Sequence, residues 1–204
     1  MLEVGCGTGA FLRKMAAEGW DVEGLEFSER AAETARSFGC AVRTGSLEDF
    51  PDPGRKYDLI VLWMVLEHLH DPVLGLRQLR RWLSPGGWLV FSVPNAGSLE
   101  FRLFREHWYA LQLPTHLYHF SPGTAKLLLE RCGWKAERIF HQRTVSNIAA
   151  SLGYLLPDQG PAGELARVLR LFPERGGWVP YVLFPLAYLL SVFGQTGRMT
   201  VWAR

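Results

Sequence analysis

Hydrophobic positions along the first hundred residues follow two alternating patterns. Short runs that are apolar at nearly every position predict buried β-strands. Segments whose apolar positions recur every three or four residues predict helices between them. Strands are expected over Leu2–Val4, Asp21–Glu26, Cys40–Thr44, Tyr57–Trp63 and Trp88–Val93, and helices over Ala10–Glu18, Ser28–Phe38 and from Asp71 to the turn at Ser84–Gly87. This alternation is typical of a parallel sheet with helices on both faces.

The second half of the chain is less regular. Residues Ala96–Ser121 are rich in aromatic residues and histidine and follow no clear period. The pattern then predicts a helix from Ser121 to about Cys132, a sixth strand over Trp134–Arg143 and a last strand over Arg198–Ala203. Between these two strands, Ser146–Gln195 is helical at first and then strongly apolar.

Composition narrows the class of protein. The 204 residues are 48% hydrophobic and 21% charged, an ordinary globular balance. The net charge is only +2 and no run of Lys and Arg occurs, so a nucleic-acid partner is not expected. Three cysteines without a Cys-x-x-Cys pair favour a reducing compartment, and Met1 is not followed by a signal-peptide pattern. We therefore expect a cytoplasmic protein.

A glycine-rich turn, Gly5-Cys6-Gly7-Thr8-Gly9, joins the first predicted strand to the first predicted helix. Such a turn presents free backbone N–H groups and a positive helix end, which suits a dinucleotide or S-adenosylmethionine. The alternative is a tight turn that serves close packing only. Glu26 ends the second strand about 20 residues after the first glycine, where a carboxylate can accept both hydroxyls of a ribose.

Seven segments of the sequence, taken in order, favour S-adenosylmethionine over a dinucleotide as the cofactor. They are Leu2–Gly9, Gly24–Ser28, Tyr57–Ile60, Leu66–Pro72, Leu83–Gly87, Ser92–Asn95 and His116–Ser121. With them the chain resembles class I S-adenosylmethionine-dependent methyltransferases over about residues 2 to 143. It is most similar to the small-molecule subgroup that includes the quinone-biosynthesis O-methyltransferases.

The resemblance implies a fold and an activity. The fold is Rossmann-like α/β, with a seven-stranded, mostly parallel sheet, an antiparallel last strand and helices on both faces. The activity is O-methylation of a small acceptor, hydrophobic or linked to a lipid or sugar, with S-adenosylhomocysteine as the product. Two alternatives stay open: a non-catalytic cofactor-binding protein of the same fold, and an NAD-dependent oxidoreductase.

The resemblance also implies which residues hold the cofactor. Glu3 would help to hold its amino group, and the backbone of the glycine turn would lie against it. Ser46 stands where the family often has Asp, and its hydroxyl would pair with the adenine amine. The expected cofactor-binding residues are Glu3, Gly5, Cys6, Gly7, Gly9, Glu26, Phe27, Ser46, Leu47, Trp63 and Met64.

Methyl transfer to oxygen requires a base that removes the acceptor's proton, and histidine, whose pKa lies near neutrality, is suited to this. His116 matches a recurrent histidine of the family and is expected to be the base, with His68 as the second candidate. The alternative for His116 is a hydrogen bond to the backbone of its own loop. Some relatives hold a divalent metal with a carboxylate at the position of Met64, so we expect no metal here.

The apolar stretch Trp178–Phe193 contains no charged residue and is shorter than the roughly 20 residues of a membrane span. Pro180 and Pro185 would interrupt it. Three interpretations are open: a buried helix over the acceptor pocket, a homodimer face, and a monotopic membrane contact. In the third, Arg167, Arg170 and Arg175 would meet anionic headgroups.

The same stretch shapes the expected domain organisation. A methyltransferase core is predicted over residues 1–145, a helical apolar insertion over 146–197 and a final strand over 198–204 that returns to the core sheet. Family members usually carry a helix before the first strand that closes over the ligands, whereas Met1 adjoins that strand here. We expect that this lid is missing from the chain as given or is replaced by the insertion, and that a longer chain would bind the cofactor more tightly.

Overall fold

The computed structural model describes residues 1–175 and 182–204, and within them the chain forms two compact units. The first unit consists of Met1–Val93, Lys126–Arg138 and Val201–Arg204. The second consists of Pro94–Ala125 and Ile139–Thr200. This division differs from the domain boundaries expected from the sequence, because residues 94–125 group with the later helices.

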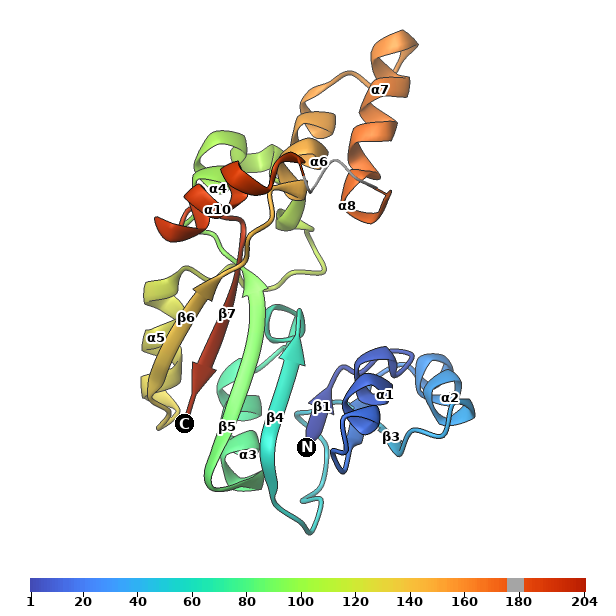
Figure 1. Ribbon diagram of the computed structural model, residues 1–204, viewed down its shortest axis with the longest axis vertical. Coiled ribbons are helices and arrows are strands. Elements are labelled where there is room, and N and C mark those ends of the chain that lie inside the picture. The colour runs from blue at the N-terminus through green and yellow to red at the C-terminus, as the bar shows by residue number, and fades with distance from the viewer. Residues whose placement is uncertain (176–181) are drawn as a thin grey trace. The chain divides into compact units, whose positions relative to one another are not determined.

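One seven-stranded sheet has the order β3-β2-β1-β4-β5-β7-β6 (Figure 1). Its strands are β1 (Leu2–Val4), β2 (Glu23–Glu26), β3 (Val42–Thr44), β4 (Tyr57–Trp63), β5 (Leu83–Pro94), β6 (Ala136–His141) and β7 (Arg198–Ala203). β1 pairs in parallel with both β2 and β4. β7 is antiparallel to β6, since Lys135 and Arg204 exchange backbone hydrogen bonds of 2.8 and 3.1 Å. The fold class predicted from the sequence is confirmed.

The helices around the first five strands begin where the sequence signals predict. They are α1 (Ala10–Ala17), α2 (Glu29–Ser37), α3 (Pro72–Trp82) and, after residue 121, α5 (Pro122–Arg131). A short 3-10 turn, η1 (Leu66–His68), precedes α3 and was not expected. The Ser28 hydroxyl accepts the N–H of Ala31 at 3.4 Å, and the Asp71 carboxylate accepts that of Leu74 at 2.9 Å. Each such cap stabilises a helix by about 1 kcal/mol.

The turn at Ser84–Gly87 has a different role from the one expected. Helix α3 ends at Trp82, and the turn already belongs to β5. The pairing of β4 with β5 shifts in register here, since Tyr57 opposes Leu83 and Leu59 opposes Trp88. Residues between the paired positions form an irregularity in the strand, which a purely local pattern does not distinguish from a helix stop.

The second unit is mainly helical. Its elements are α4 (Leu99–Phe104), the 3-10 turns η2 (Arg105–His107) and η3 (Tyr109–Leu111), α6 (Ser146–Leu155), α7 (Gly160–Arg170), α8 (Phe172–Arg175) and α10 (Phe184–Val192). Helix α4 was not expected from the sequence, although Ser98 caps it by accepting the N–H of Phe101 at 3.2 Å. Phe104, Trp108 and Ala110 form a local core with Ile148 of α6 packed against it.

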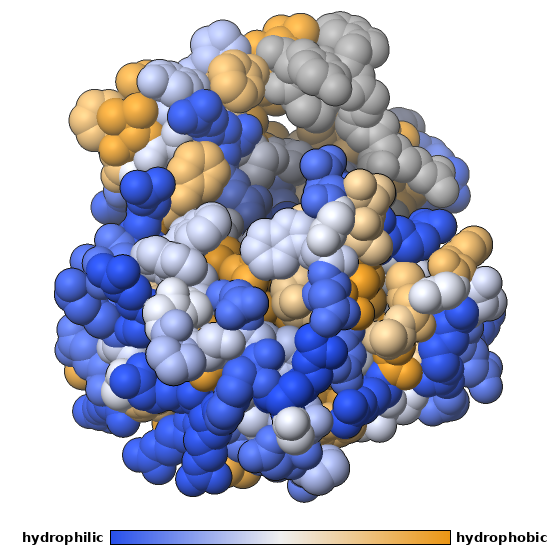
Figure 2. Space-filling view, turned by 60° about the horizontal axis from the view of Figure 1, so that its bottom comes forward, coloured by the Kyte–Doolittle hydropathy of each residue, from blue (hydrophilic) through white to orange (hydrophobic). Residues whose placement is uncertain are grey.

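Helix α10 contains the described part of the predicted apolar stretch; Pro180 and the rest of residues 178–181 lie outside the described residues. Within residues 1–175 and 182–204, no helix has the length and hydropathy of a membrane span. Ala187 is the buried residue of α10. In the view of Figure 2, hydrophilic residues dominate the surface and hydrophobic residues reach it in separate patches.

Candidate active site

The glycine turn has a backbone that requires its glycines. Gly5, Gly7 and Gly9 have φ angles of 71°, 53° and 77°, in the left-handed region that other residues rarely adopt. A Cβ on Gly5 would lie 2.4 Å from Cγ2 of Val65, so that glycine makes room for protein rather than for ligand alone. A Cβ on Gly7 would meet no atom within 4 Å. Gly7 therefore faces open space at the start of α1.

Glu26 is fixed against this turn by two backbone hydrogen bonds. Its Oε2 accepts the N–H of Gly7 at 2.8 Å, and its Oε1 accepts the N–H of Ser28 at 2.9 Å. The carboxylate thus links the end of β2 to the turn after β1. Because each oxygen has a second lone pair, the group can accept two further hydrogen bonds from a ligand.

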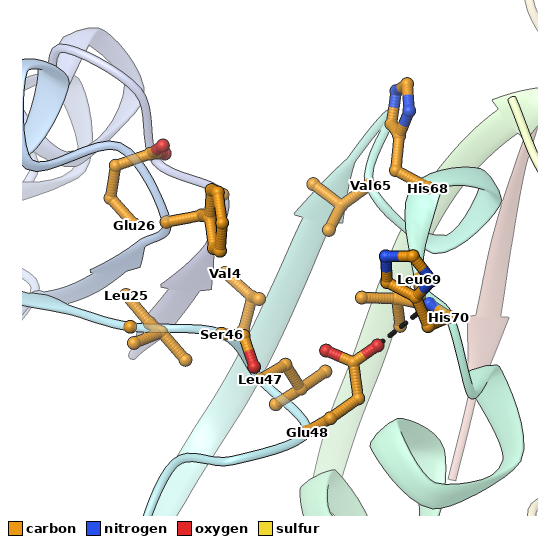
Figure 3. Close-up of a pocket in the computed structure, with 13 residues that line it drawn as sticks. Val4, Leu25, Glu26, Ser46, Leu47, Glu48, Val65, His68, Leu69 and His70 are labelled. Atoms are coloured by element: carbon orange, nitrogen blue, oxygen red, sulfur yellow. Dashed lines mark hydrogen bonds between the residues drawn. The ribbon is translucent and has the colours of Figure 1, made fainter. Parts of the chain in front are cut away.

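A cavity of about 260 Å³ opens at the carboxyl ends of the first four strands. Ligands bind at this edge of open parallel sheets. Figure 3 shows Glu26 facing Val65 and His68 across the cavity, with Ser46 and Leu47 between them. The loops after β1, β2, β3 and β4 all contribute walls to it.

The structure brings together six of the predicted site residues at this cavity: Gly5, Glu26, Phe27, Ser46, Leu47 and His68. Trp63 does not line it, since its ring packs edge-on against Phe11 with centroids 5.4 Å apart. Met64 is not on the wall either and has a φ of 57°. Val65 takes the place expected for these two residues.

Ser46 makes local hydrogen bonds that the sequence does not reveal. Its hydroxyl donates to Asp49 Oδ2 at 3.0 Å and accepts the N–H of Asp49 at 3.2 Å. The hydroxyl proton is therefore used within the loop, and an acceptor lone pair remains for an amino group at the cavity.

Sequence reasoning missed seven residues of the wall. These residues line the cavity but were not among the expected site residues: Val4, Leu25, Gly45, Glu48, Val65, Leu69 and His70. The Glu48 carboxylate accepts the backbone N–H of His70 at 2.9 Å, which joins the loop after β3 to the one after β4 (Figure 3). Glu48 lies two residues after Ser46 on the same loop, and this proximity could have marked it as a residue of the site.

Two predicted residues lie beneath the turn rather than at the cavity. Glu3 is only 3% exposed, and its Oε2 has no hydrogen-bond partner among the described residues. Burial, with the nearby charge of Glu26, raises the pKa of Glu3 to about 8. Burial likewise raises the pKa of the Cys6 thiol to about 12, and this side chain packs against Leu12.

Glu3 should make stability depend on pH. In the unfolded chain it ionises near 4.5, whereas in the fold it stays protonated up to about 8. Its contribution to stability is therefore complete below pH 4.5 and is lost as the pH rises to about 8. Glu3→Gln should raise the melting temperature by several degrees at pH 9 and leave it nearly unchanged at pH 4. Thermal melts at both pH values test this, with the exposed Glu33→Gln as control; equal shifts at both would contradict it.

His116 belongs to the second unit, where it is 2% exposed. Its Nδ1 lies 2.8 Å from the carbonyl oxygen of Ala110, the loop hydrogen bond that the sequence left as an alternative. A carbonyl oxygen can only accept a hydrogen bond, so Nδ1 carries a hydrogen, and in the neutral form of the ring the basic lone pair lies on Nε2. His119 is anchored in the same way through Nε2, 2.9 Å from the carbonyl oxygen of Leu111.

Glu100 is a second buried carboxyl that sequence reasoning did not single out. It is 2% exposed at the start of α4, and burial raises its pKa to about 7. It is packed so closely against Gly197 that a Cβ there would lie 2.0 Å from Glu100 Oε2. No motif marks this contact, because 97 positions of sequence separate the two residues.

The part of the chain that holds the glycine turn, Glu26 and the strand ends at the cavity matches a known family. The model of a methyltransferase domain matches residues 1–139, more than half of the chain. This chain belongs to the methyltransferase-domain family.

Known methyltransferases resemble the chain in sequence and in fold. The ubiquinone biosynthesis O-methyltransferase of Bordetella avium is 32% identical over 132 residues, which cover 59% of this chain and 55% of that protein. A SAM-dependent methyltransferase structure from Thermotoga maritima has a TM-score of 0.56 at 26% identity, covering 68% of this chain and 64% of the other. One from Mesorhizobium loti has a TM-score of 0.62 at 23% identity, covering 100% and 89%, and shows the fold.

This methyltransferase domain spans about half the length of the curated relatives that it matches. The family match ends at residue 139, just inside β6. The matched part therefore holds the glycine turn, Glu26, the cavity and His116, whereas α6 to α10 lie beyond it.

Proposed function

We propose that this chain binds S-adenosylmethionine in the cavity of the first unit and transfers its methyl group to an oxygen atom of a small, hydrophobic acceptor. The observation that carries the proposal is the Glu26 carboxylate, held by Gly7 and Ser28 at the cavity wall with acceptor capacity to spare. A ribose offers two adjacent hydroxyl donors, which suit such a carboxylate.

The other residues of the cavity fit the remaining parts of this cofactor. Leu47 and Leu69 give an apolar wall for an adenine ring, and Ser46 retains an acceptor lone pair for its amine. Behind the turn, the unpartnered Oε2 of Glu3 suits a cationic ligand, because a nearby positive charge would restore its ionised form. When bound, the cofactor supplies an electrophilic methyl group on a sulfonium.

The proton of the acceptor is proposed to move to Nε2 of His116. The hydrogen bond from Nδ1–H to Ala110 holds the tautomer in which Nε2 is basic, and it stabilises the imidazolium that would form. His68, which lines the cavity, is the second candidate for this role.

Support for an apolar acceptor and for oxygen comes from two observations. The segment that carries His116 exposes Leu113, Leu117 and Tyr118, by 68%, 44% and 38%. Exposed apolar residues beside a candidate base favour an apolar substrate. The relatives named ubiquinone biosynthesis O-methyltransferases, at about 30% identity, favour oxygen as the acceptor atom.

Calorimetry and a labelled methyl group test this function. We expect S-adenosylhomocysteine to bind with measurable heat at micromolar concentration, and catechol to receive the label from S-adenosylmethionine. Absence of heat would contradict the cofactor assignment. Label on ortho-phenylenediamine but not on catechol would contradict O-methylation, and binding without transfer to either would favour the non-catalytic alternative.

Gly7→Ala tests whether Gly7 leaves room for the ligand, as distinct from relieving backbone strain. Gly7 and Gly19 both have positive φ and open space where a Cβ would stand. Alanine at either should cost about 1 kcal/mol of folding free energy, because L-residues resist this conformation. Only Gly7→Ala should also weaken S-adenosylhomocysteine binding, by about tenfold or more, which corresponds to ~1.4 kcal/mol. Calorimetry and denaturation of both variants test this; equal affinity in the two would show that Gly7 does not face the ligand.

A further inference from the structure

Helix α10 forms an exposed apolar surface in the second unit. Phe184, Leu186, Leu189 and Val192 of the helix expose between 46% and 62% of their surface, and Phe193 after it exposes 69%. The sequence from residue 176 to residue 197 contains no charged side chain. A helix that is apolar on every side and yet exposed requires an apolar environment that the described residues do not supply.

Ser191 and Gln195 of this segment make hydrogen bonds within the segment itself. The Ser191 hydroxyl donates to the carbonyl of Tyr188 at 2.7 Å. The Gln195 side-chain amide donates to the carbonyl of Phe193 at 2.9 Å, and its backbone N–H donates to Leu190 at 2.8 Å. Groups that need no water can enter a low-dielectric medium at little cost.

Two arginines border the apolar helix. The Arg143 guanidinium lies 4.8 Å from the ring centre of Tyr188, and Arg102 hydrogen-bonds to the side chain of Gln195. Among the described residues, neither arginine forms a salt bridge, so both positive charges are uncompensated by carboxylates. An apolar helix with a cationic border is typical of an interface with anionic lipid.

The arginines expected from the sequence to meet headgroups are engaged elsewhere. Arg167 pairs with Glu164 at 3.3 Å, and Arg170 pairs with Asp158 at 2.7 Å. The side chain of Arg175 lies outside the described residues. The cationic border is thus made by Arg102 and Arg143, which are far from α10 in sequence.

We infer that α10 inserts into one leaflet of an anionic bilayer, with Arg143 and Arg102 at the level of the headgroups. Its nine residues extend over ~14 Å, about half of the ~30 Å hydrocarbon core, so it reaches into a leaflet without crossing it. A second copy of this chain fits the surface less well, because a symmetric pair would bring the same arginines together. This inference goes beyond the proposed methyl transfer and does not depend on it.

Vesicle flotation of the whole chain without cofactor tests the inference. We expect the chain to float with vesicles of equal parts phosphatidylcholine and phosphatidylglycerol, and weakly or not at all with phosphatidylcholine alone. Leu189→Glu should reduce binding by about tenfold or more, because a charge would have to enter the hydrocarbon. Leu165→Glu on α7, where leucine is similarly exposed at 53%, is the matched control and should bind normally.

Arg143→Gln tests the electrostatic part. It should weaken binding to the mixed vesicles by about fivefold, the contribution of one basic residue near an anionic surface, and added salt should narrow the difference. Arg131→Gln on α5 should have no comparable effect. Thermal melts establish that each variant is folded.

Three outcomes would overturn the inference. They are failure of the folded chain to float with anionic vesicles, equal losses in Leu189→Glu and Leu165→Glu, and a concentration-dependent dimer that Leu189→Glu disrupts without altering flotation. Because no cofactor is present, none of these outcomes bears on whether S-adenosylhomocysteine binds.

Discussion

Glu26→Ala is expected to weaken S-adenosylhomocysteine binding by a factor of about 100 or more. A hydrogen bond to a charged group contributes roughly 1.5–3 kcal/mol, and this carboxylate is positioned to accept two from a ribose. At ~1.4 kcal/mol for each tenfold change in affinity, the loss of both corresponds to at least this factor. The substitution also removes the acceptor of the Gly7 N–H, which orients the turn. Titration calorimetry measures the effect.

Two companion variants make the Glu26 result specific. Glu29→Ala removes a nearby carboxylate on α2 that pairs with Arg36 and does not line the cavity, so its affinity should match that of the unmodified chain. Glu26→Gln keeps the size of the side chain but replaces one acceptor by a donor. Its affinity for S-adenosylhomocysteine should therefore lie between those of Glu26→Ala and Glu29→Ala. Binding of Glu26→Ala within about threefold of the unmodified chain would show that the ribose lies elsewhere.

His116→Asn is expected to lower turnover with catechol by about 10²–10⁴-fold, the usual contribution of a general base. Asparagine can keep a donor near the position of Nδ1 and so preserve the hydrogen bond to Ala110, while the basic Nε2 is lost. Because the loop keeps this hydrogen bond, affinity for S-adenosylhomocysteine and the melting temperature should change little. Rates with labelled S-adenosylmethionine, together with calorimetry, give both quantities.

His119→Gln is the matched control for the base. The Gln amide can keep the donor to Leu111 that His119 supplies through Nε2, so turnover should be nearly unchanged. If His116→Asn loses affinity and stability in step with turnover, the histidine holds the loop and is not the base. If His68→Asn removes turnover while His116→Asn does not, the proton moves to His68.

The order of elements followed from local patterns in the sequence. β4 and β7 have the predicted limits. The largely apolar run of β4 and the alternating residues of β7 mark these limits in the sequence. The starts of α2 and α3 were predictable because Ser28 and Asp71 cap them through bonds that reach only three residues along the chain. Glu26 was predictable for the same reason: its place at the end of β2 fixes its distance from the turn.

Other features depended on contacts that no local pattern records. The wall opposite Glu26 is Val65 rather than Trp63, because Trp63 packs against Phe11. Ser46 was expected to pair with the adenine amine, and its hydroxyl also donates a hydrogen bond to Asp49 that no local pattern indicates. The start of β5 at Leu83, before the Ser84–Gly87 turn, was set by pairing with β4 and not by the turn residues themselves.

The sequence by itself determined the fold class, the glycine turn and the carboxylate beside it, because each rests on periodicity or on short, fixed spacings. Only the tertiary structure decided which side chains reach the cavity and how Glu3 is buried, because both depend on how distant segments pack. It also decided that α10 is exposed and that Arg102 and Arg143 border it. The sequence pattern of an apolar stretch is the same whether the stretch is buried or exposed. Only the residues that surround it in the fold decide between burial and exposure.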